Sequence, residues 1–549
     1  MESNEFPRRG RSTWLAVGLI AFGATCATTG LWRARGSLEN GTFTPVLAAV
    51  PAYGQTTLYS CPATGAHAAL LRELDGWTKD NGGKISPPES DGRLCATAAT
   101  LVGWAKGKGS PPASLVASVA AFFGVAEVGL KTLFTTIDND GRSGEEIAAI
   151  GSLALDTAAQ WVGDLGAGHI GLATYRLQKG TTAIAVVFAP SRFEMEPVAR
   201  RLAAGEHATI HGKLLTGYTR PTVMVSDARG LLVATDSKTA EFQAEVVCGQ
   251  NPGTMLVEIR GEQVIEPRVL AQFPVVCAAE PPVAFAVASE PQGSVDPTAA
   301  AKRLFDLANR ERTELSLTPL VWNDTIAQVA RAAGEALKSQ VEGGQGKPVD
   351  VVAQLTQAGW ASPTILENPS QSTSVAEIQA SYMASAVHRS NILNAEITHA
   401  GIAVLPAKVG TIQSFVAVQI FLRELAPVDV EATREKLKDA IFQKRTGLKA
   451  PALTLNPALT ALAQKFADEL AKAKGAIATK QEQELTEPIY RKFLNAKLVM
   501  GAKAEPLDLI GEVDLKTAGD SLGIGVASGQ HPTLGKNTPY LVILIAKKK

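Results

Sequence analysis

The stretch HAGIAVLPAKVGTIQSFVAVQIF, residues 399–421, reads as two apolar strands joined by a polar turn that contains glycine. The pattern occurs twice more, as HIGLATYRLQKGTTAIAVVFA at 169–189 and as SLGIGVASGQHPTLGKNTPYLVILIA at 521–546. Apolar, alternating segments on either side of a glycine-containing turn are typical of a β-hairpin. The chain therefore repeats one predicted hairpin three times.

A helical pattern precedes each of these hairpins. In WNDTIAQVARAAGEAL, residues 322–337, apolar side chains recur at the spacing of one helix face. GRLCATAATLVGWA at 92–105 and NPALTALAQKFADELA at 456–471 occupy the corresponding places, and a loop and a second short helix follow each one. A unit of helix, loop, helix and hairpin is too long for a solenoid repeat, so we predict three α+β domains.

A different pattern occupies residues 196–280. Short alternating strands with a turn signal about every 8–12 residues are typical of a β-sandwich, and we expect an all-β, immunoglobulin-like domain. Polar, irregular stretches at 33–55 and 281–297 are the predicted linkers. The three α+β domains are then expected at 56–195, 298–425 and 426–549.

The N-terminus carries an export signal. Arginines at positions 8, 9 and 11 precede an uncharged apolar segment at 13–32, which is long enough to span a bilayer as a helix. The basic flank places residues 1–12 in the cytoplasm. The segment is a signal anchor or a cleaved signal peptide, and lipid attachment at Cys26 is a third alternative. All three export the rest of the chain, which is membrane-anchored facing the periplasm or cell exterior, or secreted.

The remaining four cysteines form an even set, and four cysteines allow three connectivities. Because an exported chain favours disulfides, we predict the local pairs Cys61–Cys95 and Cys248–Cys277, with two buried thiols as the alternative for the second pair. No C-x-x-C motif occurs, so we expect no metal site and no cofactor. Basic and acidic residues balance at 53 each, which argues against a nucleic-acid partner.

The middle unit contains a recognisable set of motifs. LFDLANRERTELSLTPLVWNDTIAQVARAAGEAL, then ILEN, then SYMASAVHRSNILNAEITHAGIAV resemble the CAP superfamily in its bacterial, SCP-like form. The resemblance covers residues 296–425 and implies an α-β-α sandwich. The two flanking units resemble this fold only through the repeat pattern, as degenerate copies. Functions in the family are diverse: cell-wall, lipid or sterol binding, and disputed proteolysis.

The resemblance also implies a cavity with two histidines and two glutamates. Glu367, beside Asn368, matches the Glu-Asn pair of the family, and His388 matches the histidine of the following helix. Ala333 stands where the other histidine is expected, and Glu377 is the nearest acidic candidate for the second glutamate. The predicted ligand cavity is therefore Glu367, Asn368 and His388.

We expect an exported CAP-domain protein of the cell envelope that binds a lipid, a cell-wall component or a protein partner without catalysis. One alternative is a hydrolase or protease-like activity, in which His388 acts as base and Glu367 holds its tautomer. The other alternative is a purely structural scaffold. A catalytic zinc site needs three protein ligands, and Ala333 supplies none. No G-x-S-x-G or H-E-x-x-H motif occurs either, which favours the non-catalytic interpretation. The oligomeric state is left open.

Overall fold

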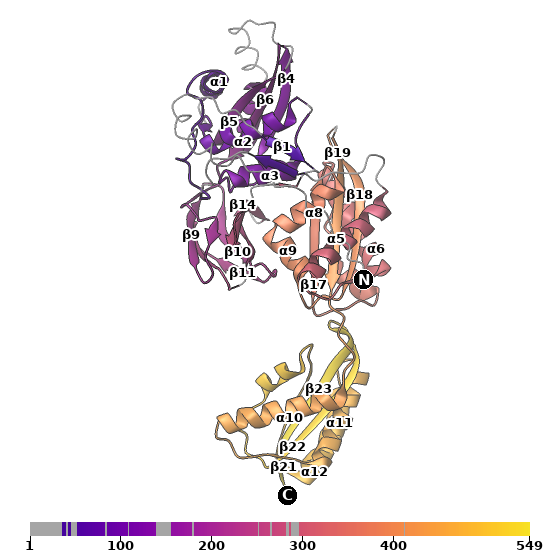
Figure 1. The fold of residues 1–549 in the computed structure, drawn as a ribbon. Helices are drawn as coiled ribbons and strands as arrows, with labels where there is room; N and C mark the ends of the chain where they lie inside the picture. Colours follow the sequence, from indigo (N-terminus) through magenta and orange to yellow (C-terminus); the bar gives the residue numbers. More distant parts are fainter. Residues whose placement is uncertain are drawn as a thin grey trace, which may run out of the picture. The chain divides into compact units, whose positions relative to one another are not determined.

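The structure is a computed structural model. It describes residues 36–39, 42–45, 52–82, 85–107, 109–138, 155–177, 180–250, 252–263, 266–281, 285–286, 296–410 and 412–549. The chain divides into two compact units, one of residues 1–292 with 379–390 and one of 293–378 with 391–549 (Figure 1). The predicted anchor or signal, including Cys26, lies outside the described residues. Within the described ranges, no helix has the length and apolarity needed to cross a membrane.

Three four-stranded sheets share one strand order, β3-β5-β6-β4, β16-β18-β19-β17 and β20-β22-β23-β21. In each sheet a two-residue strand pairs in parallel with the first strand of a hairpin. An outer strand pairs antiparallel to the second strand of that hairpin. The repeat predicted from the three hairpins is therefore present in the topology. We call the three domains the N-terminal, middle and C-terminal repeats.

The N-terminal repeat has three layers. Along β6, Ile184, Val186 and Phe188 pack with the core under α1, whereas Ala185 and Val187 pack with the core under α2. This alternation is the period of a strand that is buried on both faces. Its elements are α1 (Ala66–Asp80), β3 (Glu89–Ser90), α2 (Gly92–Ala105), α3 (Ala113–Phe122), β4 (Lys131–Asp138), helical residues 155–165, β5 (Gly168–Arg176) and β6 (Thr181–Pro190).

The C-terminal repeat has the same layering. Val542 and Leu544 of β23 pack in the core with α11 and α12, whereas Leu541 and Ile543 pack in the core with α10. Figure 1 shows these three helices beside the strands of the repeat. Its elements are α10 (Val430–Gly447), β20 (Thr454–Leu455), α11 (Pro457–Lys472), α12 (Thr479–Lys492), β21 (Phe493–Ala502), η3 (Pro506–Glu512), β22 (Ser521–His531) and β23 (Gly535–Lys548).

The middle repeat places Ile326 of α6, Leu355 of α7 and Val418 of β19 in one apolar core. Its elements are α5 (Pro297–Glu314), β16 (Val321–Trp322), α6 (Asp324–Val341), α7 (Val351–Gln357), β17 (Ile365–Ser372), α8 (Val375–Ala384), α9 (Ala386–Leu393), β18 (His399–Val409) and β19 (Ile412–Leu422).

The second helix of each repeat begins in the same way. Asp91, Asn323 and Asn456 follow the two-residue strand, and their side-chain oxygens accept from backbone N–H groups of the first helical turn. Such a cap satisfies donors that have no partner inside the helix. One short motif, strand then Asx cap, thus fixes where α2, α6 and α11 start.

The segment from residue 193 to 277 forms two packed sheets, ordered β11-β10-β13-β14-β8 and β12-β9-β7. Ile210, Val223 and Phe273 belong to the core that both sheets share, as a β-sandwich requires. The finer immunoglobulin-like assignment stays a prediction. The strands are β7 (Phe193–Met195), β8 (Arg201–Leu202), β9 (His207–Leu214), β10 (Thr219–Ser226), β11 (Leu232–Asp236), β12 (Glu241–Val247), β13 (Gly253–Gln263) and β14 (Glu266–Cys277).

The two predicted linkers contain structure that differs from the expectation. β1 (Gly36–Glu39) and β2 (Thr42–Pro45) pair as a hairpin, and β15 (Phe285–Ala286) adds to β2. In the sequence, Asn-Gly stands between two alternating segments, and that dipeptide favours a tight hairpin. Tyr53, also placed in a linker, is fully buried in the core of the β-sandwich.

Candidate functional site

Glu367 and Asn368 lie on β17 and point to opposite faces of its sheet. Neighbouring side chains of a strand alternate between the faces, so the Glu-Asn pair is divided. Glu367 is exposed, whereas Asn368 is fully buried opposite Gln419 of β19.

Asn368 belongs to an amide cluster with Gln419 and Asn391. The Asn368 Nδ2 group donates to Gln419 Oε1 at 3.1 Å, and Asn391 Nδ2 donates to Asn368 Oδ1 at 2.8 Å. Gln419 is fully buried, and its Nε2 has no acceptor among the described residues. A buried donor left in this state costs about 1–3 kcal/mol. The amide cluster therefore holds one buried donor that is unpaired among the described residues.

The carboxyl group of Glu367 lies near a second acid. Its pKa is raised, first by partial loss of water around the carboxyl group and then by the negative charge of Asp350. Asp350 is held in place because its Oδ1 accepts from the Ala353 N–H at 2.9 Å, as the cap of α7. Glu367 is thus more readily protonated than an ordinary surface glutamate.

Ala333, at the position of the missing histidine, packs against the apolar core of the middle repeat. A methyl group there contributes to packing and supplies no ligand or base. Glu377 lies buried in the first turn of α8. His399 begins β18, as its position before an alternating run predicts, with Nε2 3.6 Å from Glu424 Oε2 and its ring 5.3 Å from that of Trp360.

His388 lies on α9, in residues 379–390, which belong to the first compact unit, whereas Glu367 and Asn368 belong to the second. The pairing of His388 with Glu367 therefore stays a prediction. Burial lowers the pKa of His388; Glu258 opposes this effect and Arg260 adds to it. Both charged residues lie on β13 of the sandwich.

Glu258 is fully buried and accepts several hydrogen bonds. Its carboxylate receives Arg260 Nε at 2.7 Å, Gln272 Nε2 at 3.3 Å and the Ser385 hydroxyl at 2.9 Å. Arg389 adds hydrogen bonds at 2.8 Å to the carbonyl oxygens of Asp227 and Ala228. Segment 379–390 is thus anchored to the sandwich by charged hydrogen bonds. No sequence motif indicated these partners.

Both predicted disulfides, Cys61–Cys95 and Cys248–Cys277, are formed. Cys248 directly follows β12 of one sandwich sheet and Cys277 ends β14 of the other, so the second bridge joins the two sheets. The alternative of two buried thiols is therefore wrong. Disulfides are typical of exported proteins.

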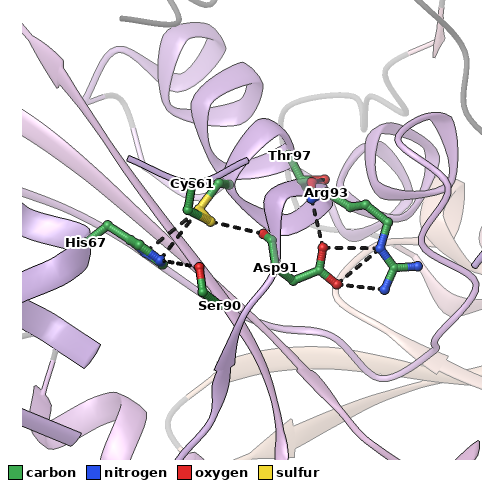
Figure 2. Close-up of a disulfide and its surroundings, with 7 residues drawn as sticks. Cys61, His67, Ser90, Asp91, Arg93 and Thr97 are labelled. Atoms are coloured by element: carbon green, nitrogen blue, oxygen red, sulfur yellow. Dashed lines mark hydrogen bonds and ion pairs between the residues drawn. A yellow bond between two sulfur atoms is a disulfide. The ribbon is translucent and has the colours of Figure 1, made fainter. Parts of the chain in front are cut away.

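A second candidate site, which the sequence analysis missed, surrounds the first disulfide (Figure 2). His67 of α1 is buried, and its Nε2 lies 2.9 Å from Ser90 Oγ, while its Nδ1 lies 3.8 Å from Cys95 Sγ. Burial lowers the pKa of His67 to about 4. A cavity of about 240 Å³ is lined by His67, Cys95, Tyr59 and Thr174, among others. His67 and the cysteines share no local motif, so only the fold could bring them together.

A buried ion pair supports this site from the other side (Figure 2). The Arg93 guanidinium lies 2.6 Å from Asp91 and 3.3 Å from Glu127. Burial disfavours the charged form of Arg93, but the negative charges of Glu127 and Asp91 together have the larger effect and raise the pKa of Arg93. Because Asp91 also caps α2, the pair fixes the helix turn that carries Cys95.

Comparison with known proteins gives one family. Residues 305–421 match the CAP model, described as the cysteine-rich secretory protein family. No curated protein matches the chain.

Three solved structures are similar to the chain, each with a TM-score of 0.20. An outer surface protein of Borrelia burgdorferi is 16% identical, over 24% of this chain and 97% of that one. A cysteine-rich secretory protein of Staphylococcus aureus is 11% identical, over 48% of this chain and 89% of that one. An extracellular protein containing an SCP domain, from Bacillus anthracis, is 14% identical, over 42% of this chain and 69% of that one. Residues 305–421, which form most of the middle repeat, are therefore a CAP domain.

Proposed function

We propose that the chain is exported and that its CAP domain binds a polar component of the cell envelope without converting it. The two disulfides support export, because such bonds form and persist in oxidising compartments. Residues 13–32 are proposed as the signal anchor or signal peptide that directs this export.

The amide cluster is the observation that carries the binding proposal. Gln419 keeps a buried Nε2 donor without an acceptor among the described residues, and Asn368 and Asn391 hold the rest of its amide in place. Side-chain amides both donate and accept, so they match the hydroxyl and amide groups of cell-wall polymers. A site for an acyl chain would instead be lined mainly by apolar side chains. The cluster therefore favours a cell-wall component over a lipid.

Ala333 is the reason to expect binding without turnover. The family's second histidine is replaced by an alanine that packs in the core. This position therefore supplies neither a metal ligand nor an acid–base group. A binding cleft tolerates this replacement, whereas an acid–base or metal tetrad loses one of its members.

A hydrolase remains the second candidate because of one observation. The pKa of Glu367 is raised and that of His388 is lowered, each first by burial. Each shift suits a group that exchanges a proton near neutral pH, and a hydrolase would need these two side chains to meet.

Calorimetric titration of the full chain with soluble peptidoglycan fragments tests the binding proposal. We expect saturable binding, and about 10-fold weaker binding for Gln419→Leu, which corresponds to the loss of one hydrogen bond of about 1–1.5 kcal/mol. Gln413→Leu is the matched control, because Gln413 lies on the same strand and is exposed. Equal affinities for the two variants would contradict the role of the amide cluster.

The same fragments separate binding from hydrolysis. After long incubation, mass spectrometry should find them intact with the wild-type chain. New products that disappear with His388→Ala would replace the proposal by the hydrolase. Binding to lipid vesicles but not to the fragments would replace it by a lipid-binding role.

A further inference from the structure

Three side chains that bind soft metal ions meet beside the cavity of the N-terminal repeat. The ligand atoms of Cys61, His67 and Cys95 all lie within 4.8 Å of one another. They come from the loop before α1, from α1 and from α2. Figure 2 shows the His67 ring pointing toward the disulfide. In the oxidised chain the two sulfur atoms are bonded to each other and are not available as thiolates.

The spacing of these atoms suits a tetrahedral ion. With Zn–S of about 2.3 Å and Zn–N of about 2.0–2.1 Å, neighbouring ligand atoms lie about 3.5–3.8 Å apart. His67 Nδ1 already lies 3.8 Å from Cys95 Sγ. The two sulfur atoms are bonded in the oxidised chain and must separate, and this follows once their bond is broken and the side chains rotate. Cys61 is partly exposed, which leaves room for that rotation.

We propose that Cys61, Cys95 and His67 form a redox-gated site for a thiophilic divalent cation, with Zn²⁺ as the representative ion. The site is closed while the disulfide is intact. Two-electron reduction opens it, because the S–S bond takes up two electrons and two protons and becomes two thiols. An exported protein dithiol supplies both and is itself oxidised to a disulfide. The cation then displaces the two thiol protons and binds two thiolates and one imidazole.

Ser90 orients the imidazole for this role. His67 Nε2 lies 2.9 Å from Ser90 Oγ, so an Nε2–H that donates to the hydroxyl leaves Nδ1 with the free lone pair. Cys95 Sγ lies 3.8 Å from Nδ1 and 3.9 Å from Nε2, so the ring must turn for Nδ1 to bind an ion. Metal-bound histidines are commonly held through their other nitrogen in this way. Ser90 is thus a positioning residue, and the cavity of about 240 Å³ provides access and space for a fourth ligand such as water.

The second disulfide has different surroundings. Cys248 Sγ contacts the carbonyl oxygens of Leu202 and Gly249, and Cys277 Sγ contacts that of Gly249. Both cysteines are buried within the sandwich core. Carbonyl oxygens are ligands for hard cations and not for soft ones. Among these contacts of the two sulfur atoms there is no nitrogen ligand like His67. The Cys248–Cys277 bridge therefore serves as an internal control.

Cobalt titration of the full chain tests the proposal. The chain is reduced with a phosphine, desalted without oxygen and titrated with Co²⁺, and Zn²⁺ is then added in competition. We expect one Co²⁺ per chain, with thiolate-to-cobalt charge-transfer absorption and tetrahedral d–d bands that Zn²⁺ abolishes. The oxidised chain should show neither signal. A reduced chain without the charge-transfer band, or one that loses its fold even with Zn²⁺ present, would overturn the proposal.

Variants then assign the ligands. Cys61→Ser with Cys95→Ser should abolish the signal, whereas Cys248→Ser with Cys277→Ser should keep it. We expect His67→Gln to lose the tetrahedral bands, and Ser90→Ala to lower the affinity about 10-fold. Folding of the histidine variant is checked on its oxidised form by near-ultraviolet circular dichroism. Signals that survive the first double variant, or an unchanged spectrum in a folded His67→Gln chain, would refute the assignment.

Discussion

Gly401 lies where β18 passes closest to α6. A Cβ atom at this position would lie 2.1 Å from the backbone nitrogen of Ala327, far inside a normal contact. Gly171 and Gly523 stand at the same place in the other two hairpins, with Cβ positions 2.2 Å from Leu94 and 2.6 Å from Leu459 backbone carbons. The glycine in each hairpin motif is therefore required by helix–sheet packing.

Gly401→Ala should consequently destabilise the middle repeat. Because the backbone of α6 must move, we expect a loss of about 1–3 kcal/mol in the free energy of local unfolding. Hydrogen exchange of the α6 and β18 amides measures this loss in a chain of several domains. Gly447→Ala is the control, since a Cβ there meets no atom within 4 Å, and it should change stability by less than about 1 kcal/mol. Equal protection in both variants would disprove the packing argument.

His67 makes the oxidised N-terminal repeat sensitive to acid. Its pKa falls from 6.5 in the unfolded chain to about 4 in the fold, through burial. Between these values the unfolded chain binds a proton that the folded chain does not, so the free energy of unfolding decreases as the pH falls. The decrease is about 3 kcal/mol once the pH is below about 4.

Thermal melting of the oxidised chain at pH 7 and pH 4.5 measures this effect. His67→Gln should show a smaller loss of stability between the two values than the wild type. His207→Gln, at an exposed position of β9, should behave like the wild type. If all three chains lose the same stability, burial of the imidazole is not the cause.

At the scale of elements, the three Asx caps differ in what surrounds them. Asn323 accepts from the Ile326 N–H at 3.0 Å and does little else for α6. Asp91 caps α2 and also neutralises Arg93, which is almost fully buried. The same local motif therefore carries an additional electrostatic role in the N-terminal repeat.

Removing the two caps should separate these roles. We expect Asn323→Ala to cost about 1 kcal/mol, the usual value for a lost cap. Asp91→Ala removes the nearer of the two carboxylates that neutralise the buried Arg93 and leaves it with Glu127 and the Gly124 carbonyl oxygen, and we expect a loss of about 3–5 kcal/mol. Hydrogen exchange of the first turn of each helix gives both values. Similar losses for the two variants would show that Asp91 acts only as a cap.

At the scale of the whole molecule, segment 379–390 depends on a carboxylate more than a hundred positions earlier in the chain. Glu258 accepts from Ser385 and lies buried between Arg260 and Gln272. Glu258→Gln weakens the charge-assisted hydrogen bonds while preserving the shape of the side chain. It should therefore release residues 379–390 from the sandwich.

Limited proteolysis and hydrogen exchange of residues 379–390 test this prediction. We expect faster exchange in Glu258→Gln by at least about 10-fold, for a loss of about 1.4 kcal/mol or more. Glu262→Gln, which is further along β13 and paired with the exposed Arg220, is the control and should leave the segment unchanged. An unchanged rate in both variants would mean that other contacts hold the segment.

The three hairpins, the helices before them, the two disulfide pairs and the CAP domain were predicted from the order of residues alone. The hairpins and helices are readable because they depend on local order, an apolar period of two or of 3.6 residues. The motifs also indicated Glu367, Asn368 and His388 as candidate cavity residues. The spatial pairing of these residues stays a prediction.

Which side chains meet across long separations became visible in the folded chain. Folding brought His67 to the Cys61–Cys95 bridge, Ser385 to Glu258, and β15 beside β2. It also gave Gln419 a buried amide donor. None of these pairs has a sequence pattern, because each arises when distant segments lose water together and their polar groups must find partners. Both candidate sites depend on that process. Local motifs therefore indicate the CAP domain but not the site at the disulfide.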